Sequence, residues 1–400
     1  MTSRERRHHG RWTLADRAER MLRELPVEVP PGTAALTVRL AYPRAAGVLD
    51  LGCQGPYGFR GWSGGARETF TVAAGWATPG YLPGELEPGV WHVLLSLHRV
   101  PPGGLEYELT AVVSDRAPAA PETAWPDPAE RPPRRDLPAP GGLRWLAGDL
   151  HTHTVHSDGR LTVPELARLA ASRGLDYLAV TDHNTVSHHP HLPAAASRYG
   201  VALIPGQELT TDFGHANVLG PGGRIDFRLP AGEWVRQAGE NGALISINHP
   251  LAGECAWLHP LTERPRLAEV WHSGWWDRRW GAPVAWAQAW RPDTVAVGGS
   301  DFHHHGADAP PGEPATWVLA EDGDVLGALA AGRAAVSAGI RGPLLLRHGD
   351  ELLALDADGT VLADDEGRRR FVRGNKVVFP AGVGMHRLET YENEVVALCS

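Results

Sequence analysis

A proline-rich segment at residues 116–142 constrains the fold most, because it separates two stretches of the 400-residue chain that have different sequence patterns. Prolines recur there among charged residues with almost nothing apolar to bury, which predicts an extended linker. Each flanking stretch is long enough to form a core of its own. We therefore predict a domain at 1–115, a linker at 116–142, a second domain at 143–341 and a small β-rich extension at 342–400.

The first stretch alternates short apolar runs with glycine and proline turns, a pattern typical of a β-sandwich. Strands are predicted at 35–40, 48–51, 69–73, 90–97 and 107–113. Ahead of them, Leu14, Ala18, Leu22 and Leu25 recur at helical spacing and predict an amphipathic surface helix. The first domain is thus expected to be an N-terminal helix followed by a β-sandwich-like fold.

After the linker, strand-like runs alternate with helical patterns, which is the signature of an α/β fold with a parallel sheet or barrel. The predicted strands are 145–150, 177–181, 201–205, 243–247, 268–271 and 294–297. One helix start is clear, because Thr162 and Glu165 can form a capping box around Pro164, and Gly174 should end this helix. Beyond residue 342 the pattern returns to strands and turns, at 344–346, 351–355, 376–379 and 394–398.

The charge pattern argues against nucleic acid and nucleotide triphosphate chemistry. The net charge is -9 and the basic residues are scattered, so no patch is expected to neutralise a phosphate backbone. Lys376 is the only lysine and is followed by Val377, which excludes a phosphate-binding loop that ends in Gly-Lys-Ser or Gly-Lys-Thr.

The cysteines and the hydropathy pattern suggest where the protein resides. Cys53, Cys255 and Cys399 are far apart and odd in number, which argues against a disulfide framework and favours a reducing cytoplasm. No run approaches the ~18 apolar residues of a membrane-spanning helix. We expect a soluble cytoplasmic protein, whose oligomeric state the sequence leaves open.

Side chains that can bind metal ions follow the ends of the predicted strands in the second domain. In chain order they are His151 and His153, Asp182 and His183, Glu208, His249, and Asp301 with His303. Because the loops after parallel strands converge above one core, we expect these side chains to meet.

Two of the H-x-H pairs in the second domain differ in context. With 20 histidines in the chain, one such pair is expected by chance, and His189 with His191 is interpreted as an ordinary loop. His151 and His153 instead precede Ser157-Asp158-Gly159. Imidazoles two residues apart on an extended segment point the same way and can hold one cation.

Five motifs together resemble the polymerase-and-histidinol-phosphatase (PHP) family of metallohydrolases. They occur in the family order between about residues 143 and 339: His151-x-His153 with Ser157-Asp158-Gly159, Thr181-Asp182-His183, Gly206-Gln207-Glu208, His249-Pro250 and Gly299-Ser300-Asp301-Phe302-His303. The β-rich region ahead of them is similar to the arrangement in the CehA/McbA-type branch.

This resemblance implies a distorted seven-stranded β/α barrel that holds two or three divalent ions. The implied ligand sets are His151, His153, Glu208 and Asp301 for a first ion, Asp158, His183 and His303 for a second, and a bridging Glu208 with His215 and His249 for a third. Imidazole nitrogen mixed with carboxylate oxygen suits zinc, manganese or iron rather than calcium or magnesium alone.

Some of these assignments have alternatives. The histidine run at 303–305 allows a shift in register, although the family spacing of one residue after Asp301 favours His303. His215 is either a ligand or a structural histidine bonded to backbone. Asp182 can instead orient a neighbouring imidazole, as outer-shell carboxylates do in metal sites.

Three other features have competing interpretations. Cys255 is close enough in sequence to His249 to bind zinc, but an inert buried thiol is expected. Residues 61–65 fit the G-x-S-x-G pattern of serine hydrolases, yet a strand rather than a helix follows, so we interpret them as a glycine-rich turn. Trp286 and Trp290 have the spacing of a helix core, whereas Trp275 and Trp276 follow a strand end and either line a substrate pocket or pack in the core.

The function that follows is hydrolysis of a phosphoester by metal-activated hydroxide, because close cations lower the pKa of a shared water. His272 or a third ion would assist the leaving group, and Arg160 is the best guanidinium candidate for a phosphate. A small-molecule substrate is expected, with no nucleic acid or membrane partner.

Two alternatives remain. The same site could hydrolyse carboxyl-type esters, amides or aryl carbamates, since hydroxide also attacks carbonyls and the CehA/McbA resemblance includes aryl-carbamate hydrolases. A non-catalytic, metal-stabilised binding protein would be expected to lack ligands, and every implied ligand is present.

Overall fold

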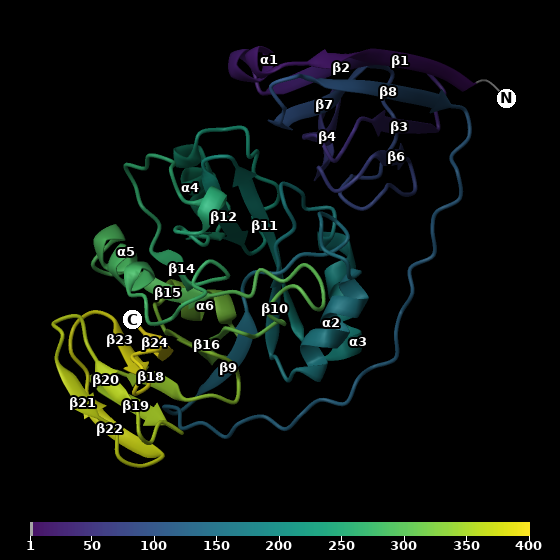
Figure 1. The fold of residues 1–400 in the computed structure, drawn as a ribbon. Coiled ribbons are helices and arrows are strands. Elements are labelled where there is room, and N and C mark those ends of the chain that lie inside the picture. The colour runs from purple at the N-terminus through teal and green to yellow at the C-terminus, as the bar shows by residue number, and fades with distance from the viewer. Residues whose placement is uncertain (1–2) are drawn as a thin grey trace. The chain divides into compact units, whose positions relative to one another are not determined.

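A computed structural model describes residues 3–400 as a mixed α/β protein with many strands and few helices (Figure 1). The mixed α/β class agrees with the prediction. The chain divides into two compact units. The first contains the residues up to Ala124 and the loops Val155–Asp158 and Asp182–Pro190. The second contains Trp125–Thr154, Gly159–Thr181 and His191–Ser400.

The first unit contains two antiparallel four-stranded sheets. One has the order β1 (Ser3–Trp12), β8 (Leu105–Ser114), β3 (Ala35–Ala41) and β6 (Thr69–Ala73). The other has the order β2 (Leu22–Val29), β7 (Gly89–Arg99), β4 (Val48–Gly55) and β5 (Gly58–Gly64). Both sheets contribute to one apolar core, in which Leu36, Phe70 and Trp91 are fully buried. All five strands predicted in this region are present.

The predicted N-terminal helix is wrong beyond its first turns. The helix α1 covers only Leu14–Glu19, and Leu22 and Leu25 lie in strand β2 instead. Pro26 provides the reason, because proline within a helix removes a hydrogen bond and clashes with the preceding turn. The exposed edge strand β1 was not predicted, since its charged sequence has no apolar alternation.

The second unit is built on a 13-stranded sheet. Its first seven strands lie side by side in chain order: β9 (Leu143–Asp149), β10 (Tyr177–Val180), β11 (Ala202–Thr211), β12 (Gly214–Leu219), β13 (Leu244–Ile247), β14 (Leu267–Trp271) and β15 (Val295–Gly298). Only β12 runs antiparallel to its neighbours. The six predicted strands are all present, whereas β12 was missed because His215 and Asn217 interrupt its apolar run.

The remaining strands extend this sheet from β9. They are β16 (Ala315–Glu321), β17 (Ala334–Ser337), β24 (Val395–Cys399), β23 (His386–Glu389), β20 (Val361–Ala363) and β21 (Arg369–Phe371). A separate three-stranded sheet contains β18 (Leu344–His348), β19 (Glu351–Leu355) and β22 (Lys376–Pro380). Strands near the carboxyl end of the chain therefore pair directly with the large sheet.

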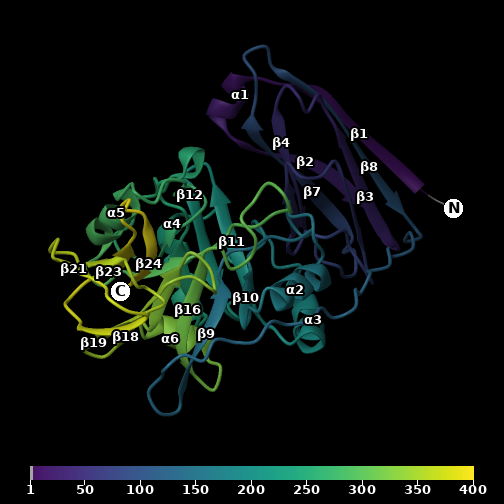
Figure 2. The same cartoon turned by 60° about the horizontal axis from the view of Figure 1, so that its bottom comes forward.

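Five helices accompany this sheet. They are α2 (Val163–Ser172), α3 (Leu192–Tyr199), α4 (Ala231–Glu240), α5 (Ala282–Trp290) and α6 (Val325–Ala330). Figure 2 shows α2 and α3 side by side, next to β10 and β11. The predicted start of α2 is confirmed: the Thr162 hydroxyl accepts from the Glu165 N–H, and the Glu165 carboxylate accepts from the Thr162 N–H. Gly174, with φ of +82°, follows its end.

The proline-rich segment has no helix or strand, but its second half is attached to the second unit. Arg131 donates to the carbonyl of Leu175 and to the carboxylate of Asp176. Arg135 donates to the carbonyls of Ile340 and Gly342. These contacts show that the segment is extended without being free of the fold.

Within residues 3–400, no helix combines the length and the apolar character needed to cross a bilayer. The three cysteines are free thiols.

Replacing Thr162 with alanine should lower the free energy of unfolding of the second unit by about 1 kcal/mol, because the first turn of α2 loses its cap. Thr162→Ser keeps the hydroxyl and should behave like the wild type. Urea denaturation followed by circular dichroism measures both, and equal midpoints for Thr162→Ala and the wild type would contradict the assignment.

Candidate metal centre

The ends of the strands in the second unit bring the predicted ligands together. His151 and His153 follow β9, His249 follows β13, and Asp301 and His303 follow β15. These residues lie up to 152 positions apart in the chain, yet their side chains are brought close together at the distances given below. The expectation that strand ends converge is confirmed for this set.

Glu208 lies at the centre of this group. Its carboxylate is fully buried, and four imidazoles approach it. The nitrogen–oxygen distances are 3.2 Å to His151, 3.5 Å to His153, 3.1 Å to His215 and 3.4 Å to His249. Glu208 lies within β11 and His215 on the adjacent strand β12, because β11 continues to Thr211 rather than ending at residue 205 as predicted.

Asp301 forms the second carboxylate of the centre. Its Oδ1 lies 3.0 Å from His153 Nε2 and 3.2 Å from His151 Nε2. Asp301 has a φ of +54°, in the left-handed region of backbone conformation that residues other than glycine rarely adopt. Such a conformation persists only where the surrounding structure holds it. A hydrogen bond from the Asp301 N–H to the carbonyl of His151 helps to hold this backbone. The ring of His303 stacks on that of His153, with centroids 4.2 Å apart.

Glu269 orients two of the imidazole residues and was not predicted from the sequence. One oxygen lies 3.0 Å from His151 Nδ1, and the other accepts from the backbone N–H of His249 at 2.8 Å. A side chain on Gly299 would approach Glu269 Oε1 to 2.4 Å, so glycine is required there. The available signal was a glutamate in the middle of the apolar strand β14.

Two further buried polar residues support the centre. Asp149 accepts from the backbone N–H groups of His151 and Ser300, and burial raises its pKa to about 6. Asn248 donates to Glu208 Oε1 at 2.8 Å. Such outer partners fix the orientation of ligands in metal sites.

The charges of the centre compensate one another. Burial alone would lower the pKa of His151, but the charges of Asp301 and Glu208 raise it well above its usual value. Burial would likewise raise the pKa of Asp301, but His151 and His153 hold it well below the usual range for aspartate. The arrangement therefore favours ionised carboxylates surrounded by positive charge.

These side chains fit a divalent ion. Nε2 of His151 is buried without a hydrogen-bond partner, 3.2 Å from one oxygen of Glu208 and 3.2 Å from one of Asp301. Ligand atoms about 2.1 Å from a tetrahedral ion are about 3.4 Å apart, which matches this spacing. One ligand atom each from His151, His153 and Asp301 lies within 4.8 Å of the others. A cation among them would replace protons as the source of positive charge.

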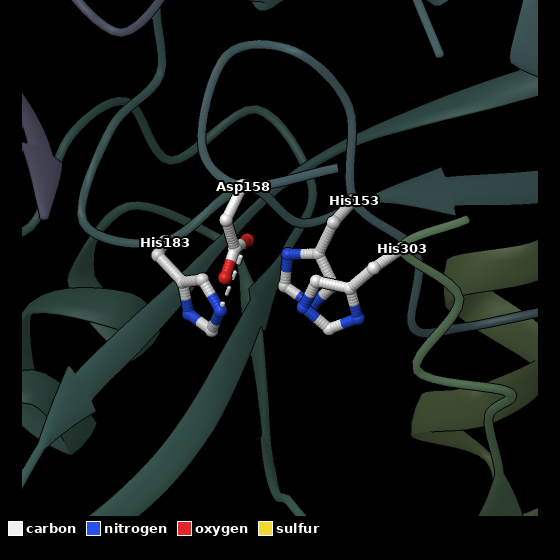
Figure 3. Close-up of side chains that lie close together, drawn as sticks. All are labelled: His153, Asp158, His183 and His303. Atoms are coloured by element: carbon white, nitrogen blue, oxygen red, sulfur yellow. Dashed lines mark ion pairs between the residues drawn. The ribbon is translucent and has the colours of Figure 1, made fainter. Parts of the chain in front are cut away.

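Asp158 and His183 lie on the loops that belong to the first unit. Figure 3 shows their ion pair, with His183 Nε2 3.5 Å from Asp158 Oδ1. The same figure shows the stacked rings of His153 and His303 from the second unit. Asp182 accepts from Ser157 and lies 3.1 Å from His188 Nδ1, which favours its predicted orienting role.

The two residues predicted to act on substrate differ in burial. His272 is buried, its Nδ1 accepts from the Gly274 N–H at 3.0 Å, and its Nε2 has no hydrogen-bond partner. Its ring centroid lies 6.5 Å from that of His249. Burial, assisted by His249, lowers its pKa to about 3, so the ring is neutral. Arg160 is exposed, and its backbone N–H donates to the carbonyl of His303.

The remaining expectations have mixed outcomes. Cys255 is half-buried rather than buried as expected. Partial burial still raises the pKa of its thiol to about 11, which keeps it protonated, as expected of an inert cysteine. The predicted turn at 61–65 is wrong, because Gly58–Gly64 forms strand β5. Ser63 is buried there and lies 3.0 Å from the Tyr81 hydroxyl, so it is no exposed nucleophile.

The tryptophans mostly pack in the interior. Trp286 and Trp290 stack within α5, with centroids 4.9 Å apart, as predicted for a helix core. Trp275 is buried against Trp271, whereas Trp276 is 80% exposed. Of the two interpretations of this pair, core packing therefore holds for Trp275.

Comparison with known proteins identifies a domain family for part of the chain. Residues 149–250 match the PHP domain. The matched segment includes the predicted ligands from His151 to His249, whereas Asp301 and His303 lie beyond it.

Two curated relatives match this region. A 5'-3' exoribonuclease Rnm from Salmonella typhimurium is 40% identical over 85 residues, 21% of this chain and 29% of that protein. A 3',5'-nucleoside bisphosphate phosphatase from Chromobacterium violaceum is 39% identical over 83 residues, 21% of this chain and 29% of that protein. The chain thus spans 29% of the length of each of these relatives.

A solved structure is also similar. It is a two-domain protein from Bacteroides vulgatus that contains a predicted PHP-like metal-dependent phosphoesterase, with 17% identity and a TM-score of 0.44. The match covers 68% of this chain and 99% of that one.

Replacing Glu269 with glutamine should weaken metal binding about 10- to 100-fold, the usual effect of losing an outer partner. Glutamine keeps the shape but offers one acceptor oxygen where the carboxylate uses two. Competition with a chelating dye measures the dissociation constant of the metal ion from each variant. Glu389→Gln changes another buried glutamate of the same unit, away from the centre, and should bind like the wild type; equal binding by both variants would contradict the role of Glu269.

Proposed function

We propose that this protein is a metal-dependent phosphoesterase whose ions are held around Glu208. The observation that carries the proposal is the buried carboxylate of Glu208 with four imidazole nitrogens at 3.1–3.5 Å. Without ions, a buried cluster of this kind would be costly, since each charge must be removed from water. With ions, the same donors form a set suited to zinc, manganese or iron.

We assign the ligands as follows. A first ion is held by His151, His153, Glu208 and Asp301, and a further ion by Glu208, His215 and His249. The contacts of Glu208 and Asp301 support both sets. The motif resemblance supports a further set of Asp158, His183 and His303, which makes the site trinuclear when all three are filled.

The proposed architecture is the one that the resemblance implies. We propose that strands β9 to β15 form the distorted seven-stranded barrel, and that the two sheets of the first unit form a β-sandwich. The chain order of these seven strands across the sheet supports the first assignment.

Bound divalent ions would supply an ionised water nucleophile at neutral pH and polarise the ester. The protein contributes orientation: Glu269 and Asn248 hold His151 and Glu208 in place. His272 accepts a hydrogen bond at Nδ1, so its neutral ring carries the proton on Nε2, where it can donate to a substrate oxygen. Arg160 offers an exposed guanidinium for a phosphate group.

The names of the relatives favour phosphoesters over carboxyl-type esters, amides and aryl carbamates. One relative is a nucleoside bisphosphate phosphatase and another is an exoribonuclease. A small phosphoester is our first proposal, and a short oligoribonucleotide tests the expectation that nucleic acid is not a substrate.

The test is a panel of nitrophenyl phosphate, bis-nitrophenyl phosphate, a nucleoside 3',5'-bisphosphate, a short oligoribonucleotide and naphthyl carbamate. We expect phosphoester cleavage that chelation abolishes and manganese or zinc restores. His153→Ala should reduce kcat by at least about 100-fold, because it removes a ligand of the first ion. His191→Ala alters the exposed member of the His189–His191 pair and should leave kcat unchanged.

Carbamate cleavage alone would favour the alternative substrate class. Full phosphatase activity in His153→Ala, or after chelation, would contradict the proposed metal centre.

A further inference from the structure

Two loops that follow strands of the second unit are structurally part of the first. The loop Val155–Asp158 follows β9 and the loop Asp182–Pro190 follows β10, yet both pack with the N-terminal residues. Several of the polar contacts that attach them are buried, and two of these contacts are made by Gly80.

Gly80 binds the second loop through both of its backbone polar groups. Its N–H donates to the Ser187 hydroxyl at 3.0 Å, and its carbonyl accepts from the Thr185 hydroxyl at 3.0 Å. The same carbonyl accepts from the N–H of Trp62, which lies within β5. Gly80 has a φ of +100°, and a Cβ would lie 2.8 Å from the Trp62 carbonyl, so only glycine fits.

The two loops are also bound to each other. The Ser187 hydroxyl lies 2.7 Å from His156 Nδ1 on the first loop. The Ser157 hydroxyl donates to Asp182 Oδ1 at 2.7 Å. Arg67, on the turn after β5, donates to the carbonyl of Val155. One N-terminal surface therefore holds both loops.

These hydrogen bonds matter for stability because the hydroxyl groups that form them are buried. Thr185 is 1% exposed and Ser187 is 6% exposed. A buried hydroxyl without a partner is unfavourable, so the loops and the N-terminal residues depend on each other for satisfied hydrogen bonds. A domain that only docks an external partner would not need such contacts with these loops.

The same loops carry two of the proposed ligands. Asp158 ends the first loop and His183 lies at the start of the second, and their side chains are 3.5 Å apart. We infer that the first unit is a positioning element of the metal site: Gly80, Thr185 and Ser187 hold Asp158 and His183 in place for one ion. This inference rests on the proposed function and assigns the N-terminal unit a role in it.

The test compares substitutions in the full-length protein. Thr185→Val keeps the shape of the side chain but removes its hydrogen bond to Gly80, whereas Thr185→Ser keeps the hydroxyl. Thr37→Val is the matched control, because the Thr37 hydroxyl bonds Thr71 within the same unit and not a residue of either loop. The readouts are ions per chain by elemental analysis after loading with Mn²⁺ or Zn²⁺, and dissociation constants by competition with a chelating dye.

We expect Thr185→Val to bind one ion about 10- to 100-fold more weakly, while the other ions bind as in the wild type. Thr185→Ser and Thr37→Val should match the wild type. Equal loading of Thr185→Val and the wild type would overturn the inference, as would equal losses in Thr185→Val and Thr37→Val, which would indicate general destabilisation.

His183→Ala separates this inference from the proposed function. If His183→Ala loses one ion but Thr185→Val does not, the ligand assignment holds and the positioning role is wrong. If His183→Ala binds every ion as the wild type does, the proposed ligand set is wrong and the positioning role falls with it.

Discussion

The buried carboxylate of Glu208 is the interaction on which the rest of the second unit depends. A charge removed from water must be compensated by neighbours, and here four imidazoles provide that compensation. Three of these imidazoles come from segments other than the hairpin that carries Glu208, so the centre also links distant parts of the sheet. Hydrogen bonding explains why three other polar residues are buried nearby: Glu269 and Asp149 accept from His151, and Asn248 donates to Glu208.

The sheet supplies the geometry that this chemistry needs. Parallel strands end on the same edge, so His151, His249 and Asp301 approach one another from β9, β13 and β15. The antiparallel strand β12 adds His215 from a position within a strand rather than from its end. Asp301 also depends on this arrangement. Its positive φ is a strained conformation, which persists only where the surrounding structure holds it.

The first unit has an unusual relation to this chemistry, because it includes two loops that carry proposed ligands. Glycine at position 80 allows backbone groups to approach closely enough to bind those loops. This β-rich region would otherwise be interpreted as an accessory domain. In the inference above, it positions Asp158 and His183. Gly80, which is hydrogen-bonded to Trp62 of β5, provides support that loop ligands lack by themselves.

Much of the fold and of the site was predictable from local patterns. Apolar runs predicted most of the strands of both units, and the Thr162–Glu165 pair predicted the start of α2. Histidines and carboxylates after strand ends predicted most of the residues around Glu208. These features succeed because they depend on neighbours in the chain or on the general geometry of parallel strands. Failures occurred where the local pattern was ambiguous: Leu22 and Leu25 have helical spacing, but Pro26 and pairing with β7 make them part of a strand.

The sequence by itself determined which side chains were available for metal chemistry and in what order they occur. Only the tertiary structure decided that Glu269 meets His151 and that Gly80 binds Thr185 and Ser187. The physical reason is that hydrogen bonds between distant segments depend on strand register and backbone approach. Neither is encoded in the spacing of residue types along the chain.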